Sequence, residues 1–215
     1  MSDVKKRILV GLAMFAAVVI IGVMQYFGLP AVRFAGIAVV VMMIIEMIAM
    51  MSRNRAMLRR DNNAWVCGGF LAWLFVMLMS VNVVGARVGL MLLLLMVICA
   101  ADIGAWFFGR IIGGDKMWER ISANKTWTGQ ITGILCGTAA AILFGLLIED
   151  RFSPWLMWIG ISVSLLSQYG DLTASWIKRR MGIKDFGNIL PGHGGLIDRF
   201  DGWIYALPLM WLVMM

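Results

Sequence analysis

Three acidic residues lie inside long apolar stretches, where a charged side chain is costly and needs a reason. They are Glu46, Asp102 and Asp171. Glu46 is close to the basic residues that follow its stretch, and we interpret it as a side chain that reaches toward them. Asp102 and Asp171 each lie about two helical turns from the end of their stretch. We therefore expect these two carboxylates to line one polar cavity.

Further polar groups follow Asp171 at helical spacing. Asp171, Ser175 and Lys178 stand at i, i+4 and i+7, which places them on one face of a helix. Oxygen atoms bind hard cations, and an ammonium group binds phosphate oxygens. The face is thus suited to a metal–phosphate site. A helix end with basic residues reaching for the membrane surface would explain Lys178, but it would not explain Asp171.

A second acidic pair lies near the end of the chain. Asp198 and Asp201 stand at i and i+3 with Arg199 between them, and they follow the glycine-rich segment 191–195. If this segment is helical, the two carboxylates share a face. Oxygen ligands favour magnesium over zinc. The single histidine, His193, has no Cys or His neighbours with zinc-ligand spacing.

The composition is that of a membrane protein. Of the 215 residues, 61% are apolar and 14% are charged, and the mean hydropathy is +0.87. Soluble domains carry about 25% charged residues. Seven apolar blocks are candidates to cross a bilayer: 8–28, 34–51, 64–81, 88–108, 129–148, 155–177 and 196–215. We therefore predict an all-α, polytopic membrane protein of about seven transmembrane helices.

The positions of the basic residues predict the orientation. If the N-terminus is cytoplasmic, sixteen of the nineteen Lys and Arg fall on the inside, and the C-terminus lies outside. The inside segments are 1–7, 52–63, 109–128 and 178–201. The net charge of +7 then reflects topology and a phosphate-rich ligand, with no nucleic acid as partner. The first apolar block is longer than that of a cleaved signal peptide, so we expect a retained helix.

The domain organisation follows from these blocks. We predict a single membrane domain over residues 1–215. Residues 1–100 form generic transmembrane spans, and residues 101–215 form a catalytic region with the cytoplasmic loops 109–128 and 178–201. Both loops interleave glycine with Lys and Arg, so their backbone N–H groups can turn toward phosphate.

The segment 175–201, SWIKRRMGIKDFGNILPGHGGLIDRFD, resembles the signature of the phosphatidate cytidylyltransferase family. The matching positions are Ser175, Lys178, Arg179, Lys184, Asp185, Gly187, Pro191, His193, Gly194, Gly195, Asp198, Arg199 and Asp201. Upstream, DIGAWFFGRIIGGDK and SANKTWTGQITG also resemble the family, through Asp102, Asn124, Lys125, Thr126 and Gly129. Ile103 and Gly202 stand where the family usually has Ser.

The resemblance implies an activity, a cofactor and partners. The expected activity is the transfer of CMP from CTP to phosphatidate, which gives CDP-diacylglycerol and pyrophosphate in phospholipid biosynthesis. It implies magnesium in a paired-cation centre held by Asp171 and Asp198, and a homodimer. We expect the protein in the inner membrane of a bacterial cell, with its active site on the cytoplasmic side.

The resemblance also suggests roles for the remaining residues. Asp201 would be a further metal ligand or an orienting group. The expected phosphate contacts are Lys125, Lys178, Lys184 and Arg199. The expected substrate-binding and nucleotide-binding residues are Asp102, Asn124, Thr126, Ser175, Asp185, His193, Gly194 and Gly195.

Other functions explain less of the sequence. A related CTP-dependent lipid enzyme, such as a polyprenol or phytol kinase or a cytidylyltransferase for another lipid phosphate, would differ in its products. A transporter with Asp102 and Asp171 along an ion pathway would not account for the long signature. A CDP-alcohol phosphotransferase is excluded, because WIYALP after Asp201 and Gly202 breaks that family's aspartate pattern.

Overall fold

The computed structural model describes residues 3–148, 150, 153–190 and 194–215, and it is predominantly helical. The chain divides into two compact units: Met1–Val88 with Ile177–Phe200 (unit 1), and Gly89–Trp176 with Asp201–Met215 (unit 2). The elements are α1 (Asp3–Tyr26), α2 (Ala31–Arg53), α3 (Arg55–Leu58), α4 (Asn63–Val84), α5 (Val88–Ile111), β1 (Lys116–Trp118), β2 (Ser122–Thr126), α6 (Trp127–Ile148), α7 (Pro154–Met181), α8 (Ile197–Phe200) and α9 (Trp203–Val213).

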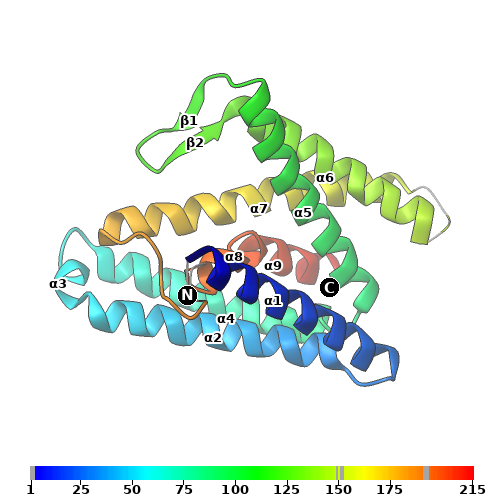
Figure 1. The fold of residues 1–215 in the computed structure, drawn as a ribbon, viewed down its shortest axis with the longest axis horizontal. Helices are drawn as coiled ribbons and strands as arrows, with labels where there is room; N and C mark the ends of the chain where they lie inside the picture. Colours follow the sequence, from blue (N-terminus) through cyan, green and yellow to red (C-terminus); the bar gives the residue numbers. More distant parts are fainter. Residues whose placement is uncertain (1–2, 149, 151–152, 191–193) are drawn as a thin grey trace. The chain divides into compact units, whose positions relative to one another are not determined.

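Unit 1 is built on the packing of α2 against α4, with α1 beside α2 (Figure 1). The buried face of α2 presents Met43, Met47 and Met50 at helical spacing, and α4 contributes Leu74 and Met77. Large apolar side chains also cover the outer faces of both helices, as expected of helices that contact lipid. They include Phe34, Ile45, Ile48 and Phe75.

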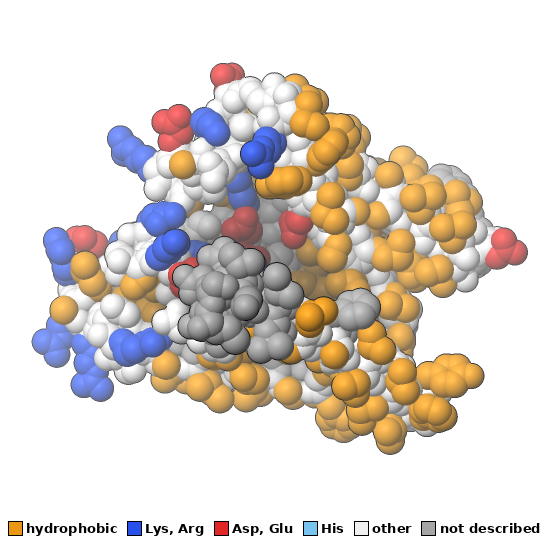
Figure 2. All heavy atoms as spheres, viewed as in Figure 1, with side chains coloured by type: hydrophobic (Ala, Val, Ile, Leu, Met, Phe, Trp, Pro, Cys, Tyr) orange, Lys and Arg blue, Asp and Glu red, His pale blue; other side chains and the backbone are white. Residues whose placement is uncertain are grey.

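Basic side chains gather where α2, α3 and α4 connect. Arg53, Arg55, Arg59 and Arg60 are all exposed there. Figure 2 shows Lys and Arg side chains in blue gathered on this side of the molecule, beside the apolar surface of the helices. The arginines belong to the segment 52–63, for which the charge distribution predicts a cytoplasmic position. The sequence had not indicated the short helix α3 within this segment.

Unit 2 contains α5, α6, α9 and the larger part of α7. Small residues let its helices approach closely. A Cβ on Gly133 of α6 would lie 2.9 Å from the carbonyl oxygen of Ala101 on α5. A Cβ on Gly137, one turn further along α6, would collide with the hydroxyl of Ser164 on α7. These glycines therefore set the spacing of three helices in unit 2.

A β-hairpin occupies most of the predicted loop 109–128 (Figure 1). β1 and β2 pair antiparallel, with Lys116 opposite Thr126 and Trp118 opposite Ser122, and the register shifts between these pairs. The chain is predominantly helical, as predicted, but the sequence did not indicate this hairpin. The strands have three and five residues and show no apolar–polar alternation, so the periodicity that reveals longer strands is missing.

Within the described residues, four helices are long and apolar enough to cross a membrane: α2, α4, α5 and α6. Two shorter apolar helices are Val10–Tyr26 and α9. The first six predicted blocks each coincide with a helix, but the seventh does not form one continuous helix. α8 ends at Phe200, and α9 begins only at Trp203.

Two local contacts lie at the break before α9. Oδ1 of Asp201 accepts the backbone N–H of Gly202 at 2.9 Å, and such a local bond competes with helical hydrogen bonding. Glycine also has low helix propensity, and a Cβ on Gly202 would lie 2.7 Å from the Ser167 hydroxyl oxygen. α9 has 11 residues, about 16 Å of helix, which is shorter than a bilayer core of about 30 Å.

Candidate active site

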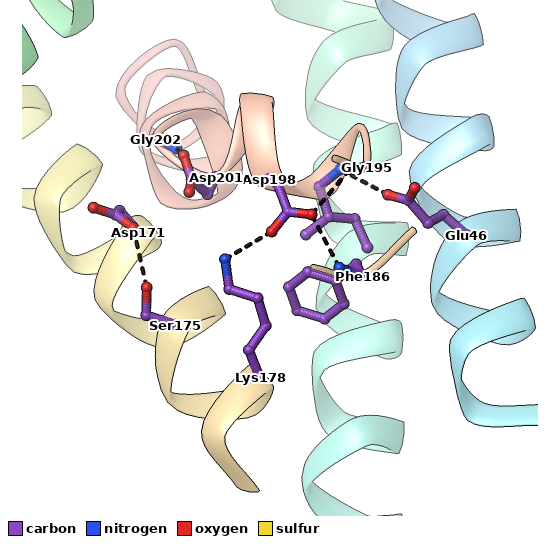
Figure 3. Close-up of polar contacts among 10 residues, drawn as sticks. Glu46, Asp171, Ser175, Lys178, Phe186, Gly195, Asp198, Asp201 and Gly202 are labelled. Atoms are coloured by element: carbon purple, nitrogen blue, oxygen red, sulfur yellow. Dashed lines mark hydrogen bonds and ion pairs between the residues drawn. The ribbon is translucent and has the colours of Figure 1, made fainter. Parts of the chain in front are cut away.

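The signature residues of unit 1 gather around the carboxylate of Asp198, which is nearly buried. Its Oδ1 lies 2.7 Å from Nζ of Lys178, and the two side chains are 6% and 14% exposed. Its Oδ2 accepts the backbone N–H groups of Phe186 at 2.9 Å and Gly195 at 3.0 Å (Figure 3). We call these four residues the Asp198 cluster. One ammonium and two N–H groups thus fix the orientation of this carboxylate.

The end of α7 turns the chain back toward Asp198. Gly182 has φ +65°, its N–H bonds to the carbonyl of Arg179, and the N–H of Ile183 bonds to the carbonyl of Lys178. This is the glycine-terminated pattern that ends many helices. It stops α7 directly after its basic run and starts the segment whose described parts, residues 182–190 and 194–196, we call the signature loop.

The signature loop is held by helices that precede the signature in the chain. The Phe186 ring stacks on Phe70 of α4, with centroids 6.2 Å apart and planes at 10°. Arg53 of α2 donates to the carbonyl of Phe186 at 3.1 Å. Arg180, at the end of α7, donates to Oδ1 of Asn63 at 2.8 Å. Generic spans thus provide specific contacts to the signature.

The sequence interpretation of Glu46 is wrong. The side chain does not extend to the basic surface but is buried, with 2% of the residue exposed. Its Oε2 accepts the backbone N–H of Ile197 at 2.9 Å. The sequence showed only that an acidic residue lies in an apolar helix. It did not indicate which segment this residue would contact.

A second cluster in unit 2 surrounds Asp171. Oδ2 of Asp171 lies 2.7 Å from Nζ of Lys125, and the side chains are 40% and 23% exposed. The hydroxyl of Ser175 donates to Oδ1 of Asp171 at 3.3 Å, which confirms that these two residues share a helix face. Lys125 also donates to the carbonyl of Gln168 at 3.3 Å. We call Lys125, Asp171 and Ser175 the Asp171 cluster.

Asp102 belongs to the surroundings of this cluster. It lies on α5, within electrostatic range of both Asp171 and Lys125. The sequence had placed Asp102 and Asp171 at similar depth in two helices, and unit 2 brings them near the same ammonium. Among the described residues Lys125 pairs only with Asp171, so the charge of Asp102 leaves negative charge here that a further cation would neutralise.

The remaining predicted residues are arranged around the two clusters. Asn124, Lys184, Asp185 and Arg199 are exposed. Gly194 has φ +85°, and a Cβ there would lie 3.2 Å from Oδ1 of Asp185 and 3.3 Å from Oδ2 of Asp198. The Gly194 backbone therefore passes close to two carboxylates. Asp201 lies in the turn before α9 and belongs to unit 2. His193 lies outside the described residues.

Thr126 has a structural role that the sequence did not indicate. It is buried and precedes the first residue of α6, and its hydroxyl oxygen accepts the N–H of Gly129 at 3.1 Å. This is the contact of a helix N-cap. Thr126 thus connects the hairpin to α6 and places Lys125, the preceding residue, at a fixed point.

Thr126→Ala is expected to destabilise the protein by about 1 kcal/mol, because the N–H of Gly129 loses its acceptor. Thr126→Ser keeps the hydroxyl and is expected to unfold close to the wild-type temperature. Thermal unfolding of the purified protein in detergent measures the difference. Equal destabilisation by both variants would show that the methyl group, and not the cap, is what matters.

Carboxylate oxygens are ligands that magnesium prefers, and magnesium at this site stays a prediction of the sequence. Among the residues with described positions, no three or more His, Cys, Asp or Glu side chains form a group able to hold a metal ion. Magnesium does not require one, because it is commonly held by one or two carboxylates with substrate phosphates and water. Asp171 is partly exposed, and Oδ1 of Asp198 keeps a lone pair beside Lys178. Each carboxylate can therefore offer one oxygen.

Comparison with known proteins agrees with the signature. Residues 2–215 match the model of the cytidylyltransferase family. The chain is 41% identical over 116 residues to the phosphatidate cytidylyltransferase of Staphylococcus saprophyticus subsp. saprophyticus. The aligned residues cover 54% of this chain and 45% of that protein. It is 44% identical over 120 residues to the phosphatidate cytidylyltransferase of Brucella suis biovar 1, over 54% of this chain and 43% of that protein.

The two comparisons differ in extent. The matched part is slightly less than half the length of the curated relatives. The family match, in contrast, takes in both units and both clusters, because it runs through nearly all of the chain. The chain belongs to the cytidylyltransferase family.

Proposed function

We propose that this protein transfers CMP from CTP to phosphatidate, giving CDP-diacylglycerol and pyrophosphate. The observation that carries the proposal is the family match across residues 2–215. The curated relatives named phosphatidate cytidylyltransferase support the choice of lipid. The geometry adds two carboxylate–lysine clusters, one in each unit, of the kind that phosphoryl chemistry uses.

The chemistry needs charge neutralisation more than a strong base. The second pKa of a phosphate monoester is about 6, so phosphatidate is largely a dianion at neutral pH and is already a nucleophile. One of its phosphate oxygens attacks the α-phosphorus of CTP. A new P–O bond forms, the bond between the α-phosphorus and the bridging oxygen breaks, and that oxygen leaves with pyrophosphate. The obstacle is the approach of two anions.

The chain's own residues address this obstacle. Lys125 and Lys178 are each fixed by a carboxylate, so their ammonium groups are already oriented when phosphates arrive. Lys184 and Arg199 are exposed and can add contacts to phosphate oxygens. Asp171 and Asp198 would each be a magnesium ligand, with Asp201 as a further ligand or orienting group. Magnesium bound there would supply charge neutralisation on the phosphates.

The same proposal includes the setting of the enzyme. We expect about seven membrane-embedded helices, of which α9 is too short to cross the bilayer alone, a cytoplasmic N-terminus, an active site on the cytoplasmic side of a bacterial inner membrane, and a homodimer. The exposed arginines of the 52–63 segment support this orientation. The lipid phosphate would reach the site while its acyl chains stay in the bilayer.

Labelled CTP tests the activity. Membranes that contain the protein, supplied with magnesium and phosphatidate, are expected to move label from the α-phosphorus of CTP into a chloroform-soluble lipid. Label on the γ-phosphorus is expected to appear only in pyrophosphate. A lipid kinase would give the reverse pattern with a polyprenol or phytol acceptor, and a transporter would consume no CTP. Membranes without the protein are the control.

A further inference from the structure

Glu46 lies outside the family signature but is buried against it. Its Oε2 accepts the N–H of Ile197 at 2.9 Å, across a sequence separation of 151 residues (Figure 3). Its Oε1 is buried and has no hydrogen-bond partner among the residues that the structure describes. A buried acid with an unsatisfied oxygen is costly, and an apolar residue would fill the same space without this cost. An apolar side chain could not accept the N–H of Ile197, so this contact is what distinguishes Glu46 from an apolar residue at the same position.

The signature loop closes around this carboxylate. A Cβ at Gly187 or at Gly195 would collide with the carboxylate oxygens of Glu46. For Gly187, the three nearest atoms all belong to Glu46. Both positions thus accept only a hydrogen in place of a side chain while Glu46 stays where it is. The backbone of the signature loop therefore packs against the Glu46 carboxylate at two positions, Gly187 and Gly195.

The contacts of Glu46 lead directly to Asp198. Ile197, whose N–H the glutamate accepts, is the first residue of α8, and Asp198 is the second. Gly195, which packs on the glutamate, donates its own N–H to Oδ2 of Asp198 at 3.0 Å. Glu46 therefore touches the backbone on the N-terminal side of Asp198 at two points.

Helix α2 provides a second anchor two turns further on. Arg53 stands at i+7 from Glu46 and donates to the carbonyl of Phe186 at 3.1 Å. The N–H of Phe186 is also a donor to Oδ2 of Asp198. One face of α2 thus holds both backbone segments that donate to this oxygen.

We propose that Glu46 is a positioning residue for Asp198. It fixes residues 195–197 so that the Asp198 carboxylate keeps one orientation, and it acts through the loop without touching nucleotide or lipid. The effect on turnover rests on the proposed function, whereas the effect on the loop does not.

Hydrogen exchange of the full chain in detergent, without nucleotide or metal, tests the contact. In Glu46→Ala, amides in residues 183–200 are expected to exchange about tenfold faster, because the N–H of Ile197 loses its acceptor. Glu46→Gln keeps an acceptor and is expected to exchange close to the wild type. Ser80→Ala is the matched control: Ser80 is fully buried on α4, and its hydroxyl bonds within its own helix. It is expected to leave 183–200 unchanged.

Gly187→Ala gives an independent measure of the same contact. Alone, its methyl group displaces the Glu46 carboxylate, and faster exchange is expected in residues 183–200. Combined with Glu46→Ala the collision disappears, so the double variant is expected to exchange no faster than Glu46→Ala. Additive effects would mean that the two residues do not interact. Gly187→Ala also keeps the test available if Glu46→Ala fails to fold.

Kinetics separate positioning from a general loss of structure. Glu46→Ala is expected to lower kcat about tenfold while KM for CTP stays within about twofold, and Glu46→Gln is expected to restore most of kcat. Unchanged exchange in 183–200, or faster exchange with an unchanged kcat, would overturn the proposal. Faster exchange in a protein whose wild type shows no CMP transfer would leave the loop contact standing and defeat the proposed function.

Discussion

Asp198→Asn is expected to lower the rate of CMP transfer by about a thousandfold, the largest effect that we predict. Asparagine keeps an oxygen for the N–H groups of Phe186 and Gly195, so the loop retains its shape. The negative charge is lost, and with it the site for a cation and the partner of Lys178. Removal of one preorganised electrostatic group typically costs about 10²–10³ in kcat. Incorporation of CMP into lipid is the measurement.

The buried pair makes a control necessary. Lys178 and Asp198 are 14% and 6% exposed, so an unpaired ammonium could destabilise the protein by about 3–5 kcal/mol. The double variant Lys178→Met with Asp198→Asn removes that charge and is expected to unfold nearer the wild-type temperature while remaining inactive. Near-normal turnover in either variant would remove Asp198 from the reaction.

Asp171→Asn is expected to lower kcat by at least about a hundredfold while hardly changing stability. Asp171 and Lys125 are 40% and 23% exposed, and an ion pair at this exposure contributes about 0–1 kcal/mol. A large loss of activity at nearly constant unfolding temperature would therefore report a role in the reaction. The contrast with Asp198→Asn, where stability also falls, distinguishes the two carboxylates.

Thr173→Ala is the matched control for Asp171→Asn. Thr173 lies two residues further along α7. Its hydroxyl donates to the carbonyl of Tyr169 at 2.8 Å and accepts from the hydroxyl of Tyr205 on α9 at 3.2 Å. It belongs to neither cluster, so its removal is expected to leave kcat within about twofold of the wild type. If Thr173→Ala reduced turnover as strongly as Asp171→Asn, the loss would reflect a disturbed helix and not the missing carboxylate.

The sequence alone predicted the helices and one local contact. Six of the apolar blocks coincide with helices, because length and hydropathy are properties of a continuous segment. Asp171 and Ser175 meet as predicted, since i and i+4 neighbours are fixed by helix geometry alone. The signature residues were also recognisable, because their types and spacing are written in 27 consecutive positions.

Two structural features that involve only a few local contacts were not predicted from the sequence. The hairpin of β1 and β2 depends on the pairing of two very short strands. The break between α8 and α9 coincides with a side-chain hydrogen bond of Asp201 and with the close packing of Gly202. Neither feature leaves a periodic pattern, and hydropathy averaged over a long block hides both.

Only the tertiary structure gave Glu46 its partner. The sequence marks it as an acid in an apolar helix, but the segment that it contacts is 151 residues away. The same holds for Lys125 and Asp171, which lie on separate elements. Buried polar groups require hydrogen-bond partners, and hydropathy and local spacing in the sequence show which groups will be buried. The partner is determined by which backbone and side-chain groups the folded chain brings within about 3 Å.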